Sequence, residues 1–152
     1  MSTQDTRTAR IGRAIELSGR GEGDQARQLL TELWDELEDG NDVVQRCAVA
    51  HHLADVQDDP RDELKWDLRA LQAADDLTPE ALLRAGATAS IAGLYPSLHL
   101  NLGEDYRKVG DLSAARRHLQ LGQQASAALG DDGYSQMIRR GLDGLAARLE
   151  TG

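Results

Sequence analysis

Apolar residues recur at intervals of three and four along most of the chain, which is the spacing of the buried face of an α-helix. No segment alternates convincingly between apolar and polar residues as a half-buried strand does, and β-branched residues are few. The pattern therefore predicts an all-α protein. Start and stop signals divide the chain into helices at residues 5–19, 22–38, 41–57, 60–76, 79–94, 96–109, 111–129 and 132–149. Connections this short predict that consecutive helices run antiparallel.

Pairs of aspartates fall at three predicted junctions, namely Asp58–Asp59, Asp75–Asp76 and Asp131–Asp132. A carboxylate at the start of a helix accepts hydrogen bonds from the unpaired N–H groups of the first turn. We therefore expect each pair to cap the helix that follows it. Proline is tolerated at the first helical position, so Thr78 before Pro79 is a further start signal, and Pro60 plays the same part.

Residues 100–119, LNLGEDYRKVGDLSAARRHL, carry the most specific repeat signal. Its positions Leu102, Gly103, Tyr106, Gly110, Asp111, Ala115 and Leu119 resemble the tetratricopeptide repeat. In that family small residues let two antiparallel helices approach closely, and large residues fill the gaps. A weaker copy runs through Ala14, Leu17, Gly21, Ala26, Leu30 and Leu33. A third copy runs through Ala50, Leu53, Leu64, Leu68 and Leu71.

The resemblance implies a single domain over residues 1–152, in which about three antiparallel hairpins stack as a short tetratricopeptide-like solenoid. The terminal units of a solenoid must hide their apolar side, so the helix at 132–149 is expected to cap the stack.

The spacing between the repeats indicates an inserted helix. The corresponding positions Ala26, Leu64 and Ala115 lie 38 and 51 residues apart, against a family period of about 34. Residues 79–94 supply the extra helix in the second gap. Either 79–109 is one long helix bent or broken at Pro96, which we favour because proline removes a backbone hydrogen bond, or the chain forms four plain hairpins.

Length and composition narrow the class of protein further. A chain of 152 residues can bury a continuous core, and it has no apolar run near the roughly 18 residues of a membrane span. The N-terminus lacks the apolar core of a signal peptide. Cys47 is the only cysteine, which excludes an intramolecular disulfide and a multi-cysteine zinc site. We expect a soluble, cytoplasmic protein.

The net charge restricts the class of partner. At −9 the chain would repel a phosphate backbone, and its basic residues are scattered among acids. We expect a basic or neutral partner, with no binding to nucleic acid or to a membrane.

The segment HHLADVQDDP, residues 51–60, holds candidate chemistry. His51 and His52 point about 100° apart around a helix, which predicts that they do not share one metal ion. His51 lies in line with Cys47 and Asp55 at four-residue steps. This line lacks the converging geometry and oxyanion donors of acyl transfer. As a metal site it would need a further imidazole, from His99 or His118.

A helical wheel of residues 43–57 indicates that His51 and Asp55 form a polar surface of the helix and not a catalytic or metal site. Two sides of this helix are expected to pack against other helices. One side carries Val49, Leu53 and Val56, and the other carries Val43, Cys47, Ala50 and Ala54. A narrow strip remains, made of Val44, Ala48, His51 and Asp55. Such a strip is expected where a solenoid presents its concave face.

The helix at 96–109 is expected to line the same groove. In tetratricopeptide domains that hold a partner's terminal carboxylate, an asparagine and basic residues occupy comparable places. The resemblance extends only in part, because residues 8–19 offer no basic groove side chain. We predict binding of an extended protein or peptide segment, with no cofactor, metal or catalytic residue, through His51, Asp55, Asn101, Glu104, Arg107 and Lys108.

Other conspicuous residues have simpler explanations. His99, His118, Trp34 and Trp66 are expected to pack between helices. The loop GRGEGD at residues 19–24 lacks a Walker lysine and predicts a hairpin turn.

Two alternative functions stay open. One is an enzyme acting on a small molecule or using a metal, with His51, Asp55 and Cys47 in a cavity closed by residues 79–94; an enzyme is the less favoured class. The other is a self-associating structural protein, such as a homodimer.

Overall fold

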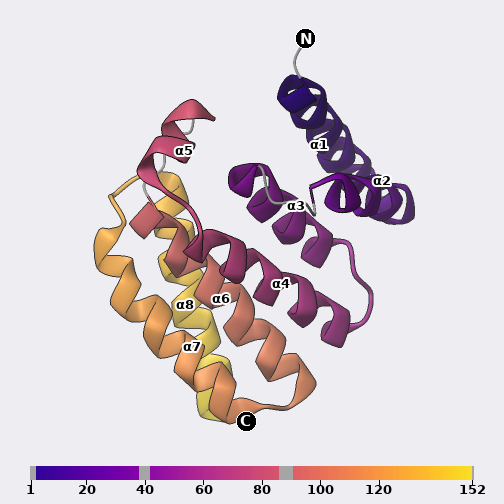
Figure 1. Cartoon of the computed structure of the whole chain (residues 1–152). Helices are drawn as coiled ribbons and strands as arrows, with labels where there is room; N and C mark the ends of the chain where they lie inside the picture. Colours follow the sequence, from indigo (N-terminus) through magenta and orange to yellow (C-terminus); the bar gives the residue numbers. More distant parts are fainter. Residues whose placement is uncertain (1–2, 38–41, 86–90, 152) are drawn as a thin grey trace. The chain divides into compact units, whose positions relative to one another are not determined.

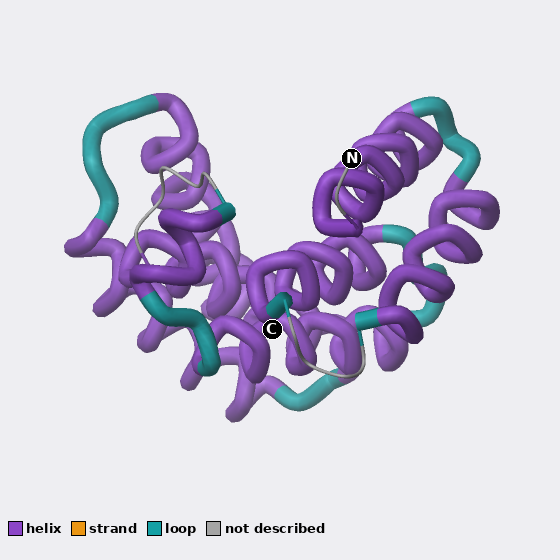
Figure 2. The backbone as a smooth tube through the Cα atoms, turned by 45° about the horizontal axis from the view of Figure 1, so that its top comes forward, coloured by secondary structure: helices purple, strands orange, loops and turns teal. Residues whose placement is uncertain are grey.

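The computed structural model describes residues 3–37, 42–85 and 91–151, and these residues form helices and loops without strands (Figure 2). The helices, labelled in Figure 1, are α1 (Thr3–Gly19), α2 (Gly23–Glu36), α3 (Val43–Asp55), α4 (Pro60–Asp75), α5 (Pro79–Arg84), α6 (Ile91–Val109), α7 (Leu112–Ala125) and α8 (Gly133–Thr151). A short 3₁₀ helix follows α7 at Ser126–Ala128. The all-α prediction is confirmed. None of the described helices combines the length and apolar character needed to cross a membrane.

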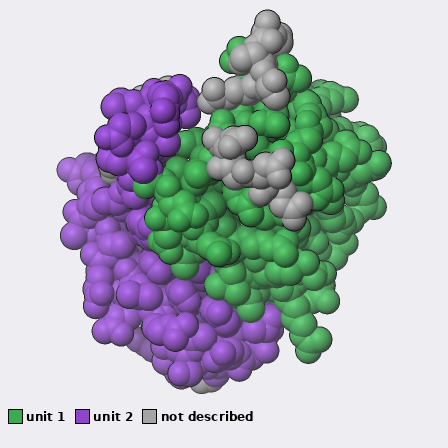
Figure 3. Space-filling view, in the orientation of Figure 1, with its two compact units in different colours: residues 1–77 green, residues 78–152 purple. Residues whose placement is uncertain are grey.

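The chain divides into two compact units, Met1–Leu77 and Thr78–Gly152, coloured separately in Figure 3. The first unit holds α1 to α4, and the second holds α5 to α8.

The first unit consists of two helical hairpins. Helix α1 packs on α2 and α3 packs on α4, while α3 also contacts both helices of the first hairpin. Its buried apolar residues on these helices are Ala14, Leu17, Ala26, Leu30, Leu33, Trp34, Val49, Ala50, Leu53, Ala54, Trp66, Ala70, Ala73 and Ala74. The Trp34 and Trp66 rings meet edge to face with centroids 5.1 Å apart, and the Arg46 guanidinium lies 4.2 Å from the Trp34 centroid. The predicted packing role of both tryptophans is confirmed.

The second unit is built around the α6–α7 hairpin, and α8 packs against both of its helices. Close approach depends on glycine. A Cβ atom at Gly103 of α6 would lie 2.5 Å from Cδ2 of Leu145 of α8, and one at Gly122 of α7 would lie 2.8 Å from Cδ2 of Leu142. Leucines of α8 therefore occupy the space that side chains at these glycines would need.

The turns of α1–α2 and α6–α7 have the same structure. Gly21 and Gly110 have φ of 79° and 90°, a conformation that strongly favours glycine. The Glu22 N–H donates to the Leu17 carbonyl at 2.9 Å, as the Asp111 N–H does to the Tyr106 carbonyl at 2.9 Å. Both turns are Schellman motifs. The loop GRGEGD is thus a hairpin turn, as predicted.

Two of the three aspartate pairs cap helices. Asp59 accepts a hydrogen bond from the Arg61 N–H at 2.9 Å at the start of α4, and Asp132 accepts one from the Ser135 N–H at 2.7 Å before α8. The prediction for Asp75–Asp76 was wrong, because Asp75 is the last residue of α4, Asp76 is its C-cap, and Thr78 caps α5 instead.

Two predictions for residues 79–109 were wrong, namely a helix boundary at Pro96 and a single helix over the whole range, whereas a helical course through Pro96 agrees with the favoured bent helix. Helix α5 ends at Arg84, capped by Ala85, and residues 86–90 of the predicted helix lie outside the described residues. Helix α6 begins at Ile91 and continues through Pro96. Pro96 is buried, and its carbonyl faces Gly122 of α7. Burial of the proline ring against the second unit therefore offsets the loss of one backbone hydrogen bond in α6.

The leucines that the sequence analysis assigned to the third repeat copy do not form the buried face of α4. Leu68 is 40 % exposed, whereas Trp66 and Ala70 are buried. The apolar face of α4 is defined by Trp66 and small alanines rather than by its leucines.

Candidate functional site

The last turn of α3 brings His51, His52 and Asp55 together. His51 and Asp55 are four residues apart, and Nε2 of His51 lies 3.9 Å from Oδ2 of Asp55. The two imidazole centroids are 5.2 Å apart with the rings tilted by 59°. Val44, Ala48 and His51 are half-buried and Asp55 is exposed, which agrees with the predicted partly open strip on this helix.

The side chains of His51 and His52 do not diverge as the 100° step around the helix led us to expect. One ligand atom from each of His51, His52 and Asp55 lies within 4.8 Å of the other two. The 100° step around a helix fixes the direction of each Cα–Cβ bond, but rotation about χ1 and χ2 decides where the ring nitrogens lie.

Cys47 lies outside this cluster. Its thiol donates to the Ala70 carbonyl at an Sγ–O distance of 3.5 Å, and burial raises the pKa of Cys47 to about 11. A neutral, hydrogen-bonded thiol is a weak nucleophile and a weak metal ligand. Of the predicted line, only His51 and Asp55 belong to the cluster, and His52 is the member that sequence reasoning set aside.

A cavity of about 280 Å³ adjoins the cluster within the first unit, between α1, α2 and the end of α3. Its lining residues are Ala14, Ile15, Ser18, Gly19, Leu30, His52, Asp55 and Val56. Burial, and then the neighbouring His51, lower the pKa of His52, while the charge of Asp55 acts in the opposite direction. The cavity is thus mainly apolar, with a neutral imidazole and a carboxylate at its wall.

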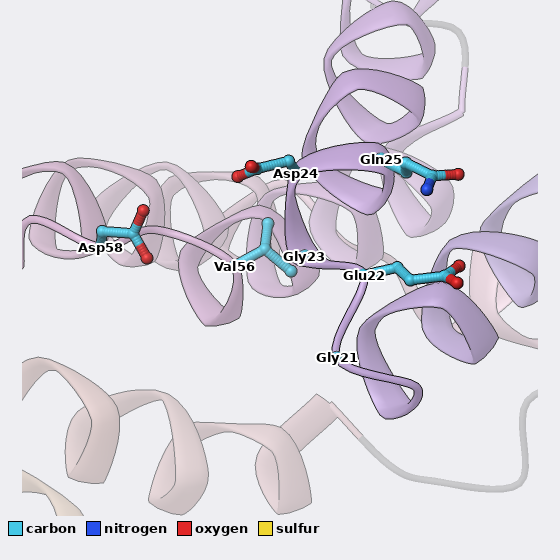
Figure 4. Close-up of a pocket in the computed structure, with 7 residues that line it drawn as sticks. All are labelled: Gly21, Glu22, Gly23, Asp24, Gln25, Val56 and Asp58. Atoms are coloured by element: carbon cyan, nitrogen blue, oxygen red, sulfur yellow. The ribbon is translucent and has the colours of Figure 1, made fainter.

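A second, acidic cavity of about 500 Å³ lies at the α1–α2 turn (Figure 4). It is lined by Gly21, Glu22, Gly23, Asp24, Gln25, Val56 and Asp58. Arg27 forms an ion pair with Asp24 and lies 3.7 Å from Asp58, which offsets part of the negative charge. Val56 lines both cavities, so they are neighbours.

The chain matches no family model, no curated protein and no solved structure.

The remaining predicted groove residues lie on α6 of the second unit. Asn101 is half-buried and Lys108 is exposed. Glu104 accepts two hydrogen bonds from Arg107, at 3.1 and 3.0 Å, and pairs with Arg148 of α8. Glu104 and Arg107 are therefore brought together as an ion pair within their own unit. The predicted groove would join α3 of the first unit to α6 of the second, and it stays a prediction.

His99 and His118 have the packing role that was expected. Their Nδ1 atoms lie 3.0 Å apart in a hydrogen bond, so one ring donates and the other accepts. The rings form a stack with Tyr95 and Tyr106 between α6 and α7, with centroids 5.2 to 6.0 Å apart. Burial, His99 and Arg117, in that order, lower the pKa of His118 to about 4.

Proposed function

We propose that the protein is a tetratricopeptide-like binding module and that its first unit holds a short segment of a partner protein at the end of α3. The apolar cavity walled by His52 and Asp55 is the observation that carries this proposal. An apolar pocket with a few converging polar groups is the usual form of a binding site.

The repeat-like architecture rests on matching hairpins. Gly21 precedes the buried Ala26 by five positions, as Gly110 precedes the buried Ala115. The helix that follows each hairpin contacts both of its members, α3 in the first unit and α8 in the second. Hairpins that each bury the face of their neighbour are typical of helical repeat proteins, which bind extended segments.

The cavity is large enough to take one aliphatic side chain of a partner. Small-molecule pockets usually have volumes of about 300–1,000 Å³, and this cavity is slightly smaller at about 280 Å³. Ala14, Leu30 and Val56 provide a buried apolar lining. We expect one aliphatic side chain of the partner to enter it.

The charges around the cavity favour basic residues beside that side chain. Asp55 stands at the wall of the apolar cavity, and Glu22, Asp24 and Asp58 line the neighbouring acidic one. Arg27 offsets only part of this charge, and the chain as a whole carries −9. Complementary charges raise association rates and discriminate against acidic partners. Asn101 and Lys108 are proposed as further contacts for a partner at the second unit.

A set of capped octapeptides tests this proposal by fluorescence anisotropy. The first peptide carries a central leucine flanked by lysines, the second replaces leucine by glycine, and the third replaces the lysines by glutamates. We expect the first to bind most tightly, and Asp55→Lys to weaken it about tenfold. Asp143→Lys, an equal charge change at an exposed site of α8, is the matched control and should leave the affinity nearly unchanged.

Two results would count against the cavity as the binding site. One is equal weakening by Asp55→Lys and Asp143→Lys, which would indicate attraction to net charge alone. The other is equal affinity for the leucine and glycine peptides.

A further inference from the structure

The His51, His52 and Asp55 cluster can do more than form the wall of a cavity. In the described part of the chain it is the one group of three or more histidine, cysteine or acidic side chains whose ligand atoms converge. We propose that these three residues bind a divalent transition-metal ion, with Zn²⁺ as the representative. Two imidazoles and a carboxylate suit such ions, whereas Mg²⁺ and Ca²⁺ prefer oxygen ligands.

The distances are close to those a metal would impose. Zn²⁺ holds nitrogen and oxygen at about 2.0–2.2 Å, which places two tetrahedral ligand atoms about 3.4 Å apart. The His51 and Asp55 atoms are 3.9 Å apart, and all three ligand atoms lie within 4.8 Å of one another. The side chains of His51 and Asp55 are 37 % and 57 % exposed, so rotation can bring the ligand atoms together without moving α3.

The surroundings of His51 also leave its imidazole ring free to turn toward a metal ion. Nδ1 of His51 is buried and has no hydrogen-bond partner among the described residues. Most imidazoles that are fixed for a structural role are hydrogen-bonded on their buried nitrogen, as His99 and His118 are with each other. Reorienting the His51 ring toward a metal therefore breaks no hydrogen bond at Nδ1.

Three protein ligands leave at least one coordination position open. Structural zinc sites are usually closed by four protein ligands, and sites with three keep a position for water or another donor. Because His52 and Asp55 also line the apolar cavity, the open position would adjoin it. The proposed ion requires no bound partner segment, so metal binding and peptide binding can be tested separately.

Isothermal titration of chelator-treated protein with ZnCl₂ tests the site, and Co²⁺ absorption reports the ligand geometry. We expect one ion per chain. His52→Gln and Asp55→Asn should each weaken binding at least tenfold, since even outer-shell changes cost 10–100-fold. Asp143→Asn is the matched control, because this exposed carboxylate of α8 lies outside the cluster and should leave the affinity within twofold.

The unsubstituted protein provides a test that does not depend on variants folding. In its NMR spectrum the ring Cε1–H signals of His51 and His52 should shift with one equivalent of Zn²⁺, while those of His99 and His118 stay in place. Substoichiometric binding, unchanged affinity in a folded His52→Gln variant, or shifts confined to His99 and His118 would each overturn the proposal.

Discussion

The four histidines of the chain occupy two different environments. His51 and His52 end α3 beside a carboxylate, whereas His99 and His118 are hydrogen-bonded to each other between α6 and α7. Sequence alone predicted packing for the second pair, because both lie among apolar and small residues. It misjudged the first pair, since a helical wheel gives the direction of a side chain but not the position of its ring nitrogens.

Because His118 is buried beside His99, we expect the second unit to lose stability in acid. The pKa of His118 falls from about 6.5 in the unfolded chain to about 4 in the folded unit. Between these values the unfolded state binds more protons, so stability is complete above pH 6.5 and falls as the pH decreases toward 4. Hydrogen exchange of α6 and α7, corrected for the intrinsic exchange rate, should therefore accelerate from pH 7 to pH 5.

His118→Gln is the control for this pH effect. The variant should be less stable at pH 7 but should show a flatter pH dependence over the same range, because it lacks the titrating imidazole. Equal corrected exchange at pH 5 and pH 7 in the unsubstituted protein would contradict the account.

At the scale of helices, periodicity and caps predicted most of the architecture. Helices α1 to α4, α7 and α8 lie close to their expected ranges, and Asp59, Thr78 and Asp132 cap as expected. The errors occurred where tertiary packing outweighs a local signal. Pro96 is retained inside α6 because it is buried beside α7, and α4 buries alanines and Trp66 in place of Leu68.

Replacing glycine by alanine should change the stability of the second unit in opposite directions at Gly103 and Gly144. Gly103→Ala should lower the free energy of unfolding by about 1–3 kcal/mol, because the new methyl group would lie 2.5 Å from Cδ2 of the buried Leu145, which would have to shift within a packed core. Gly144→Ala meets only the guanidinium of the exposed Arg148. It should raise stability by up to about 1 kcal/mol through helix propensity. Urea unfolding followed by circular dichroism measures both, and a gain in stability for Gly103→Ala would refute the packing argument.

At the scale of the whole molecule, the binding proposal combines a repeat-like architecture with one cavity. The sequence supplied His51 and Asp55, and the resemblance to tetratricopeptide repeats supplied the idea of a groove. The sequence could not predict the cavity, because its lining residues Ala14, Leu30 and Val56 come from three separate segments. These segments meet only through the packing of α1, α2 and α3. The place of His52 in the cavity wall depends on the same packing.

Chemical-shift mapping with the lysine-flanked leucine peptide tests the central claim most directly. If the first unit binds through its cavity, saturable shifts will concentrate at Ile15, Ser18, His52 and Val56, with smaller shifts at the start of α2. Saturable shifts centred on α7 and α8, with the cavity residues unchanged, would contradict the account.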